Sequence, residues 1–365
     1  MFAKFVLLGV SILLSVLLAE GLSRLVLNPI DLLQPEMVHD AHLNHKISPG
    51  SGGHDANGFR NYSVPASVEI IAIGDSMTYG VAATADDAWP QTLQRISGMK
   101  VYNMALGGYG PLHYEYLVRN YAFGFKPRII VVGLYLGNDF MDAYNLVYSN
   151  ETWARYRKDA EDSDVDAASL VEFVQDDDKF LGGLRDFLSK QSILYAILTR
   201  SFVGDLVRSR EKRGGDIKAI ITAAEGVTFI NVANFVAGLD PSDNRILEGM
   251  MLSLGALERI KRVCDDKEIG LVVTIIPTKA RVYREEIVAI PELDNRSEII
   301  ATLENEDRLR SSIVQKFMEN EIEFIDLLPV LQQHARLKNI YPANDGHPNA
   351  IGYMAIAEEI YRKIQ

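Results

Sequence analysis

Ser76 is the residue of this sequence whose type and setting best suit nucleophilic chemistry. It closes the block Gly74-Asp75-Ser76, which follows an apolar run from Ile70 to Ile73 and precedes Gly80. Such a pattern predicts a buried strand that stops at a tight turn, with a helix behind it and the serine hydroxyl at the carboxyl edge of a sheet. A tripeptide of this kind alone is more often an ordinary turn, so its interpretation depends on the rest of the chain.

Two further polar segments follow predicted strands. The strand Lys100 to Met104 runs into a segment that contains Gly107, Gly108 and Gly110, where backbone amides can approach a ligand closely unless this is only a glycine-rich loop. The buried strand Arg128 to Leu136 runs into Gly137-Asn138-Asp139. Open α/β sheets bind ligands outside the carboxyl ends of their strands, so these segments are expected near Ser76.

Other helices and strands alternate along the chain as a parallel sheet with crossover helices requires. Asp87 is expected to cap a helix with Pro90 in its first turn and with Leu93 and Ile96 facing inward. Strands are expected over 271–277 and 323–327, and helices over 246–267, 298–320 and 350–364. The 246–267 helix is expected to bury Met250, Leu254, Leu257 and Val263.

Four ordered blocks resemble the SGNH, or GDSL, hydrolase superfamily. They are Gly74 to Ser76, the glycine segment at Gly108, Gly137 to Asp139, and Asp345 to Asn349 (DGHPN). The chain looks most like larger bacterial members that carry a hydrophobic N-terminal segment and a D-x-x-G-F-R motif. Here that motif is Asp55, Gly58, Phe59 and Arg60, and the resemblance covers roughly residues 55–140 and 270–363.

The resemblance implies a catalytic triad and an oxyanion hole. Ser76 would be the nucleophile, His347 its general base and Asp345 the acid that orients the imidazole. The Ser76 amide, the Gly108 amide and the Asn138 side chain would hold the oxyanion, and no cofactor or metal is implied. Many members place the aspartate three residues before the histidine, where this chain has Asn344, so Asp345 departs from the commoner spacing.

The order of these residues also indicates the fold class. An α/β-hydrolase places its serine in G-x-S-x-G, with the acid and histidine far apart. Here the serine comes first, and the acid and histidine share one late segment. We therefore expect a three-layer α/β/α sandwich with a parallel, flavodoxin-like sheet and an inserted, mainly helical cap region.

Three segments are expected along the chain: an N-terminal membrane anchor or signal segment (1–27), a linker (28–68), and a hydrolase domain (69–365) with an insertion at about 140–245. The insertion is indicated by acidic residues crowded between Asp159 and Asp178, followed by helical spacing from Lys190 to Arg210. It would either shape substrate access or be a structural decoration.

The N-terminal segment suggests export. The run Phe5 to Ala19 carries no charge, follows Lys4 and spans about 22 Å as a helix, short of a ~30 Å hydrocarbon core unless its flanks contribute. It is either a signal peptide or, as we favour, an uncleaved anchor, because the small residues of a cleavage site are poorly placed. The hydrolase domain would then be extracytoplasmic, periplasmic in a Gram-negative cell, or secreted after cleavage.

Composition excludes some partners. The net charge is -12 and the pI is about 5.1, so the chain offers no basic stripe for nucleic acid. Cys264 is the one cysteine and cannot form an intramolecular disulfide. The histidines His39, His42, His45 and His54 suggest a metal site, but steps of three drift around a helix and no cysteine or paired carboxylate completes a set.

The sequence therefore predicts a serine esterase whose substrate is a small-molecule or glycan ester. The O-acyl or O-acetyl group that it removes is expected on a cell-envelope glycan or lipid. Two alternatives stay open at this point. The same triad could transfer an acyl group to a polysaccharide, or the fold could serve as a non-catalytic glycan-binding scaffold. The oligomeric state is not indicated.

Overall fold

Five strands form one parallel sheet in the order β4-β3-β5-β6-β7. The computed structural model describes residues 2–158, 182–200, 232–290, 296–342 and 345–365. The three central strands are almost entirely buried, as the apolar runs predict for a sheet covered on both faces. The strands are β3 (Ile70–Gly74), β4 (Val101–Asn103), β5 (Ile129–Tyr135), β6 (Gly270–Ile276) and β7 (Glu323–Asp326).

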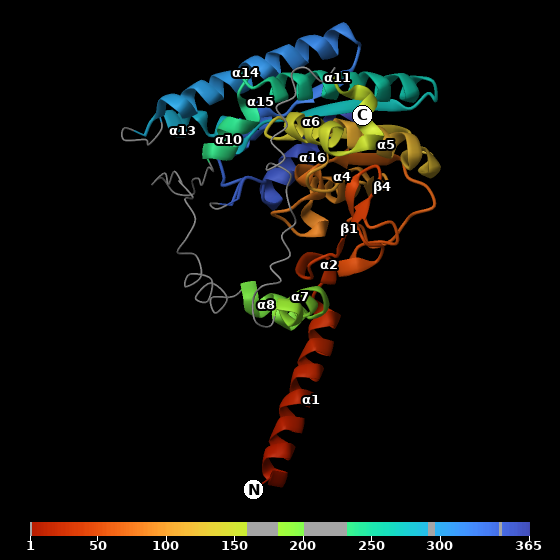
Figure 1. The fold of residues 1–365 in the computed structure, drawn as a ribbon, viewed down its shortest axis with the longest axis vertical. Helices are drawn as coiled ribbons and strands as arrows, with labels where there is room; N and C mark the ends of the chain where they lie inside the picture. Colours follow the sequence, from red (N-terminus) through yellow and green to blue (C-terminus); the bar gives the residue numbers. More distant parts are fainter. Residues whose placement is uncertain (1, 159–181, 201–231, 291–295, 343–344) are drawn as a thin grey trace. The chain divides into compact units, whose positions relative to one another are not determined.

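Helices pack on both faces of this sheet. α4 packs with α16, and α11 packs with α5 and α6. α4 and α16 lie on the opposite side of the sheet from α11 and α14 (Figure 1). The expected three-layer α/β/α sandwich with a parallel, flavodoxin-like sheet is confirmed. The helices are α3 (Ser76–Tyr79), α4 (Trp89–Ser97), α5 (Pro111–Asn120), α6 (Asp139–Ser149), α10 (Val232–Leu239), α11 (Asn244–Asp265), α12 (Lys279–Val282), α13 (Arg284–Val288), α14 (Arg296–Glu319), α15 (Leu328–Ala335) and α16 (Ala350–Ile364).

The chain changes its direction of progress across the sheet at β3. It adds β4 on one side of β3 and then β5, β6 and β7 on the other. In doubly wound sheets, ligands bind at this switch point, outside the carboxyl ends of the strands. Ser76 follows β3 and Asn138 follows β5, so two predicted site residues lie there.

The described residues divide into two compact units. The sheet belongs to the unit of residues 39–46, 64–170 and 217–365, which we call the sheet unit. The other comprises 1–38, 47–63 and 171–216, and we call it the anchor unit. Its helices are α1 (Phe2–Val26), α2 (Pro29–Leu32), α7 (Gly182–Gln191) and α8 (Ile193–Arg200). A separate two-stranded sheet pairs β1 (Met37–Asp40) with β2 (Asn44–Ile47), and its residues 39–40 and 44–46 belong to the sheet unit.

α1 is longer than the uncharged run that predicted it. It has 25 residues, a mean hydropathy of 2.4 and no buried residues, and it measures about 37 Å at 1.5 Å per residue. The helix continues past Ala19 because the next two charges are satisfied. Arg24 Nε donates to Glu20 Oε1 at 2.9 Å, and Glu20 also accepts the backbone N–H groups of Ile193 and Leu194 at 3.0 and 3.1 Å.

The D-x-x-G-F-R motif forms a turn within the anchor unit. Asp55 Oδ1 accepts the backbone N–H groups of Asn57 and Phe59 at 2.8 and 3.0 Å. Gly58 has φ 84°, and a Cβ there would overlap the Ile47 carbonyl. Arg60 pairs with Asp31 at 2.9 Å. Each motif residue therefore has a structural contact in this unit.

Two details of the helix predictions are wrong. Asp87 does not cap α4; it lies in a short 3₁₀ helix (Ala85–Asp87) and its Oδ2 accepts from Thr84 Oγ1 at 2.7 Å. The N-cap position belongs to Ala88, which has no side chain to cap with. α4 therefore begins without a side-chain cap, although Pro90 and the buried Leu93 are placed as expected.

The buried face of α11 is also rotated from the expected one. Leu257 is buried, but Met250, Leu254 and Val263 are only half-buried. The buried face instead includes small residues such as Gly249, where a Cβ would overlap the Phe140 carbonyl of α6. Closely packed helices need small residues at their contact, and such residues do not contribute to the hydrophobic periodicity from which the buried face was predicted. The other small buried residues of this face are Ser253 and Ala256.

The described parts of the expected insertion are helical. α6 packs against α5 and α11, so the first eleven residues after Asn138 belong to the core of the sheet unit. The helix expected from Lys190 is divided, because α7 ends at Gln191 and α8 begins at Ile193. The acidic segment between Asp159 and Asp178, and residues 201–210, lie outside the described residues. The domain boundaries after residues 27 and 68 stay a prediction.

Candidate active site

Ser76 is positioned by a short strand, turn and helix. It is the first residue of α3, and Asp75 caps this helix by accepting the Met77 N–H at 2.9 Å. Gly74 and Gly133 are paired on neighbouring strands, and a Cβ on either would overlap Thr78 Oγ1. The two glycines therefore let α3 start directly above the strands, with the Ser76 hydroxyl at the sheet edge.

Three of the predicted site residues form a continuous hydrogen-bonded relay. His347 Nε2 lies 2.8 Å from Ser76 Oγ, and His347 Nδ1 lies 2.6 Å from Asp345 Oδ1. Because the ionised carboxylate only accepts, Nδ1 carries the proton and Nε2 accepts from the serine hydroxyl. Asp345 Oδ1 also accepts the backbone N–H of His347 at 2.8 Å, a bond that the two-residue spacing makes possible.

The environment keeps Asp345 ionised. Burial by itself raises the pKa of Asp345, but the hydrogen bonds from the His347 side chain and backbone outweigh it, and the pKa is lowered overall. A second carboxylate, Asp75, lies 3.2 Å from Ser76 Oγ and is the alternative acceptor for its one hydroxyl hydrogen, and burial raises the pKa of Asp75 to about 6. Asn344, the alternative position for the acid, lies outside the described residues.

The glycine segment lies against Ser76. A Cβ on Gly107 would be 3.6 Å from Ser76 Cβ, and one on Gly110 would be 2.9 Å from the Asp139 carbonyl. The segment therefore runs between the serine and the start of α6. Gly108 has φ 78°, a conformation that glycine adopts readily. Asn138 precedes α6, and its Oδ1 is buried without a hydrogen-bond partner among the described residues.

Lys279 is a residue beside the site that the sequence analysis missed. It is only 4% exposed, and its Nζ donates to the carbonyl of Pro342 at 2.6 Å and to that of Asp345 at 3.0 Å. Burial lowers the pKa of Lys279 to about 8, although the charge of Asp345 partly offsets this. The lysine thus ties the start of α12 to the backbone of the predicted acid.

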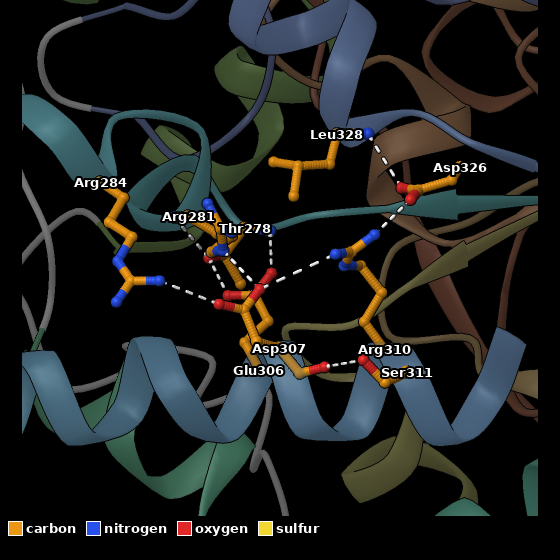
Figure 2. A network of polar contacts seen from close by, with 9 residues as sticks. All are labelled: Thr278, Arg281, Arg284, Glu306, Asp307, Arg310, Ser311, Asp326 and Leu328. Atoms are coloured by element: carbon orange, nitrogen blue, oxygen red, sulfur yellow. Dashed lines mark hydrogen bonds and ion pairs between the residues drawn. The ribbon is translucent and has the colours of Figure 1, made fainter.

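The neighbouring Thr278 is held from beneath by α14, as Figure 2 shows. Glu306 is fully buried, and its two oxygens accept the backbone N–H and the hydroxyl of Thr278 at 2.8 and 2.6 Å. Burial raises the pKa of Glu306 to about 7. Beside it, Asp307 pairs with Arg281 at 2.7 Å and with Arg284 at 3.0 Å. α14 therefore fixes the α12–α13 segment that carries Lys279.

His45, which the sequence analysis considered only as a metal ligand, is a second residue beside the site. Its Nε2 lies 3.0 Å from the carbonyl oxygen of Gly107, in the glycine segment. The nearby His42 stacks on Tyr116 with ring centroids 4.8 Å apart. Among the described residues, no group of three or more His, Cys, Asp or Glu side chains is arranged to hold a metal ion. The spacing of three residues did not indicate that His42 and His45 contact different segments of the chain, at Tyr116 and Gly107.

No protein-family model matches this chain, and no curated protein matches it. Solved structures with a similar fold include GDSL-type lipases and esterases, the superfamily that the sequence blocks resemble. One is phospholipase A1 from Streptomyces albidoflavus NA297, with 13% identity, a TM-score of 0.40 and coverage of 82% of this chain and 99% of that one.

A GDSL-like lipase from Bacteroides thetaiotaomicron has 12% identity and a TM-score of 0.37, covering 81% of this chain and 86% of that chain. A catalytic mutant of an acetylxylan esterase from Geobacillus stearothermophilus has 11% identity and a TM-score of 0.36, covering 82% and 95%. At such identities and TM-scores these similarities carry no argument about chemistry, which rests on the residues of this chain.

Proposed function

We propose that this protein is a serine ester hydrolase of the SGNH type. The observation that carries the proposal is the relay from Ser76 Oγ through His347 to Asp345, with distances of 2.8 and 2.6 Å. A serine hydroxyl is a weak nucleophile until an adjacent base takes its proton, and an acid that orients the base completes the arrangement.

The relay would act in two steps. Ser76 Oγ attacks the ester carbonyl carbon while His347 Nε2 takes the hydroxyl proton, and the imidazolium then gives this proton to the departing alcohol. A water molecule, deprotonated by the same nitrogen, next attacks the acyl carbon. The bond between that carbon and Ser76 Oγ breaks, the imidazolium returns its proton to Oγ, and the carboxylic acid is released. Asp345 stabilises the imidazolium in both steps through the bond to Nδ1.

The negative charge of each tetrahedral intermediate would be held by the N–H groups of Ser76 and Gly108 and by the amide of Asn138. The contact of Gly107 with Ser76 supports this assignment, since it brings the glycine segment to the nucleophile. Asn138 follows the strand paired with β3, at the same sheet edge as Ser76, and its Nδ2 would be the donor to the anion. Preorganised donors of this kind each lower a barrier by about 3 kcal/mol.

We further propose that α1 anchors the protein in a membrane with the sheet unit on the extracytoplasmic side. The whole helix is about 37 Å long, so its uncharged run together with its flanks exceeds the ~30 Å of a hydrocarbon core. Lys4, near its N-terminal end, favours a cytoplasmic position for that end. This location favours an O-acyl or O-acetyl ester of a cell-envelope glycan or lipid as the substrate.

The test is hydrolysis of p-nitrophenyl acetate and a longer-chain ester by the full chain in detergent, beside Ser76→Ala and His347→Ala. We expect the wild type to hydrolyse at least one ester and both variants to lose at least 1,000-fold in kcat. Melting temperatures of the three proteins control for folding. Equal rates in wild type and Ser76→Ala would contradict the proposal.

The location has its own test. In membranes of the expressing cell, we expect the full chain to resist extraction by alkaline carbonate, and the sheet unit to be digested by protease only from the extracytoplasmic side. Release of the intact chain by carbonate would contradict anchoring, and it would leave the ester hydrolase proposal unaffected.

A further inference from the structure

We propose that His45 is a positioning residue that orients the peptide unit between Gly107 and Gly108, and so aims the Gly108 N–H at the oxyanion. The inference rests on the proposed hydrolase function and names a residue that the SGNH blocks do not contain. Its starting observation is the 3.0 Å contact between His45 Nε2 and the Gly107 carbonyl oxygen. A carbonyl only accepts, so Nε2 carries the hydrogen and donates it.

The covalent geometry of the peptide transmits this bond to the oxyanion hole. The Gly107 C=O and the Gly108 N–H belong to one planar trans peptide, in which they point in opposite directions. A donor that fixes the carbonyl therefore fixes the direction of the N–H. The hydrogen bond also polarises the peptide, which strengthens the N–H as a donor on its other side.

An external support is needed here because two glycines flank this peptide. Neither has a Cβ to restrict it, and Gly108 already has φ 78°. The imidazole also supplies contact: a Cβ on Gly108 would lie 3.4 Å from His45 Cε1, so the ring lies directly against this residue. Rotation of the peptide would lose both the hydrogen bond and this packing.

His45 is itself well held within the sheet unit. Tyr109 Oη donates to the His45 backbone carbonyl at 2.9 Å, and the two rings have centroids 5.3 Å apart. The preceding turn is fixed by Asn150 Nδ2, which donates to the Ala41 carbonyl at 3.0 Å, and by Trp153 Nε1, which donates to the His42 carbonyl at 2.8 Å. The imidazole can therefore impose its position on the glycine segment.

A second imidazole holds the other end of the segment. The Gly110 N–H donates to His113 Nδ1 at 3.0 Å, which requires a neutral ring, and burial lowers the pKa of His113 to about 3. Burial also lowers the pKa of His45. Both rings thus stay neutral near pH 7, one as a donor to Gly107 and the other as an acceptor from Gly110.

The experiment compares His45→Phe, which keeps an aromatic ring but has no donor, with His45→Gln, whose amide nitrogen can reach the place of Nε2. We expect His45→Phe to lower kcat for p-nitrophenyl acetate about tenfold with KM changed less than twofold, and to weaken binding of phenylboronic acid by a similar factor. His45→Gln should recover at least half of the loss in kcat. His45→Leu replaces His45→Phe if that variant does not fold.

A readout without turnover separates this inference from the proposed function. In chain labelled with ¹⁵N-glycine, the Gly108 amide resonance should shift in His45→Phe and return toward the wild-type position in His45→Gln. Unchanged Gly108 resonance, or kcat and boronate affinity within twofold of wild type in His45→Phe, would overturn the role of His45. A wild type that neither hydrolyses esters nor binds the boronate would instead overturn the hydrolase proposal, while the resonance still reports on His45.

Discussion

Ser76 and His347 reach the candidate site by different routes. Ser76 follows a strand in the middle of the sheet, and the contacts that place it are local: the Asp75 cap at 2.9 Å and the close fit of Thr78 over Gly74. His347 and Asp345 lie outside the sheet, and their segment is tied to Lys279, which is 66 positions before Asp345 in the chain. The position of Ser76, which we call the serine side of the site, follows from local backbone geometry. The position of His347 and Asp345, the histidine side, depends on buried polar contacts.

This difference predicts different sensitivities for the two sides. Steric contacts do not depend on pH, whereas the buried Lys279 and Glu306 can gain or lose a proton. Substitutions on the serine side should therefore act through stability, and those on the histidine side through activity and pH dependence. Four experiments test this contrast.

The largest effect is expected for Asp345→Asn. The amide cannot stabilise the imidazolium as a carboxylate does, so kcat should fall by about 10³ to 10⁴ in steady-state ester hydrolysis. Asp75→Asn is the matched control, because it changes the other carboxylate near Ser76 and keeps the oxygen that caps α3. An equal loss in both variants would show that the acid is not Asp345 alone.

Glu306→Gln should remove part of the pH dependence of stability. The pKa of Glu306 is raised by burial from an ordinary value of 4.5 to about 7, so the folded state binds the proton more tightly. This contribution to stability is fully present below pH 4.5 and is lost as the pH rises through 7. At 1.4 kcal/mol per pKa unit, the loss is about 3 kcal/mol.

Urea unfolding at pH 5 and at pH 8 measures this change. Wild type should lose more free energy of unfolding between the two pH values than Glu306→Gln does, because glutamine does not titrate. Glu304→Gln, which changes a carboxylate on the same helix, is the control. Equal pH dependence in wild type and Glu306→Gln would mean that Glu306 titrates normally and that the bonds to Thr278 do not depend on its proton.

Gly133→Ala tests the serine side. Its Cβ would overlap Thr78 Oγ1, and overpacking of this kind destabilises by about 1 to 3 kcal/mol. Thr78 Oγ1 is buried without a partner among the described residues, so Thr78→Ala in the same chain should restore most of the loss. Thermal unfolding of the two single variants and the double variant gives the coupling, and additive effects would exclude a steric cause.

The smallest effect is expected for Lys279→Met. It removes the donor to the carbonyls of Pro342 and Asp345 but keeps an unbranched side chain of similar length. We expect kcat to fall about tenfold, or 1.4 kcal/mol in the barrier, while KM stays within twofold. Lys316→Met on the surface of α14 controls for loss of a charge, and unchanged kcat in Lys279→Met would mean that the bonds to Lys279 do not position Asp345.

The strands and the serine turn could be predicted because their signals are local. β3, β5 and β6 are continuous apolar runs, and the closing helix was expected over Ala350–Ile364, where it is found. The relay itself was expected only from the family blocks, since nothing in the spacing of Ser76 and His347 brings them together. The structure places them 2.8 Å apart, and their catalytic role stays a prediction.

The supporting residues could not be predicted, since their contacts join distant segments. Lys279 follows a strand end like many surface lysines, and only the fold shows that it is buried. His45 was noticed for its spacing from His42, yet its partner Gly107 lies 62 positions away. Glu306 is one of many acidic residues on a helix whose pattern does not distinguish it from its exposed neighbours.

The hydrogen bond between Ser76 and His347 spans 271 positions of the chain, which has a consequence for biosynthesis. A ribosome completes β3, β5 and β6 long before it reaches the histidine. Until then, the serine has its turn and its helix but no base. In the proposed mechanism, ester cleavage requires that residue 347 has been made and that α16, which starts at Ala350, has packed on α4. On that proposal, a partly synthesised chain has no esterase activity before the segment that carries His347 has folded.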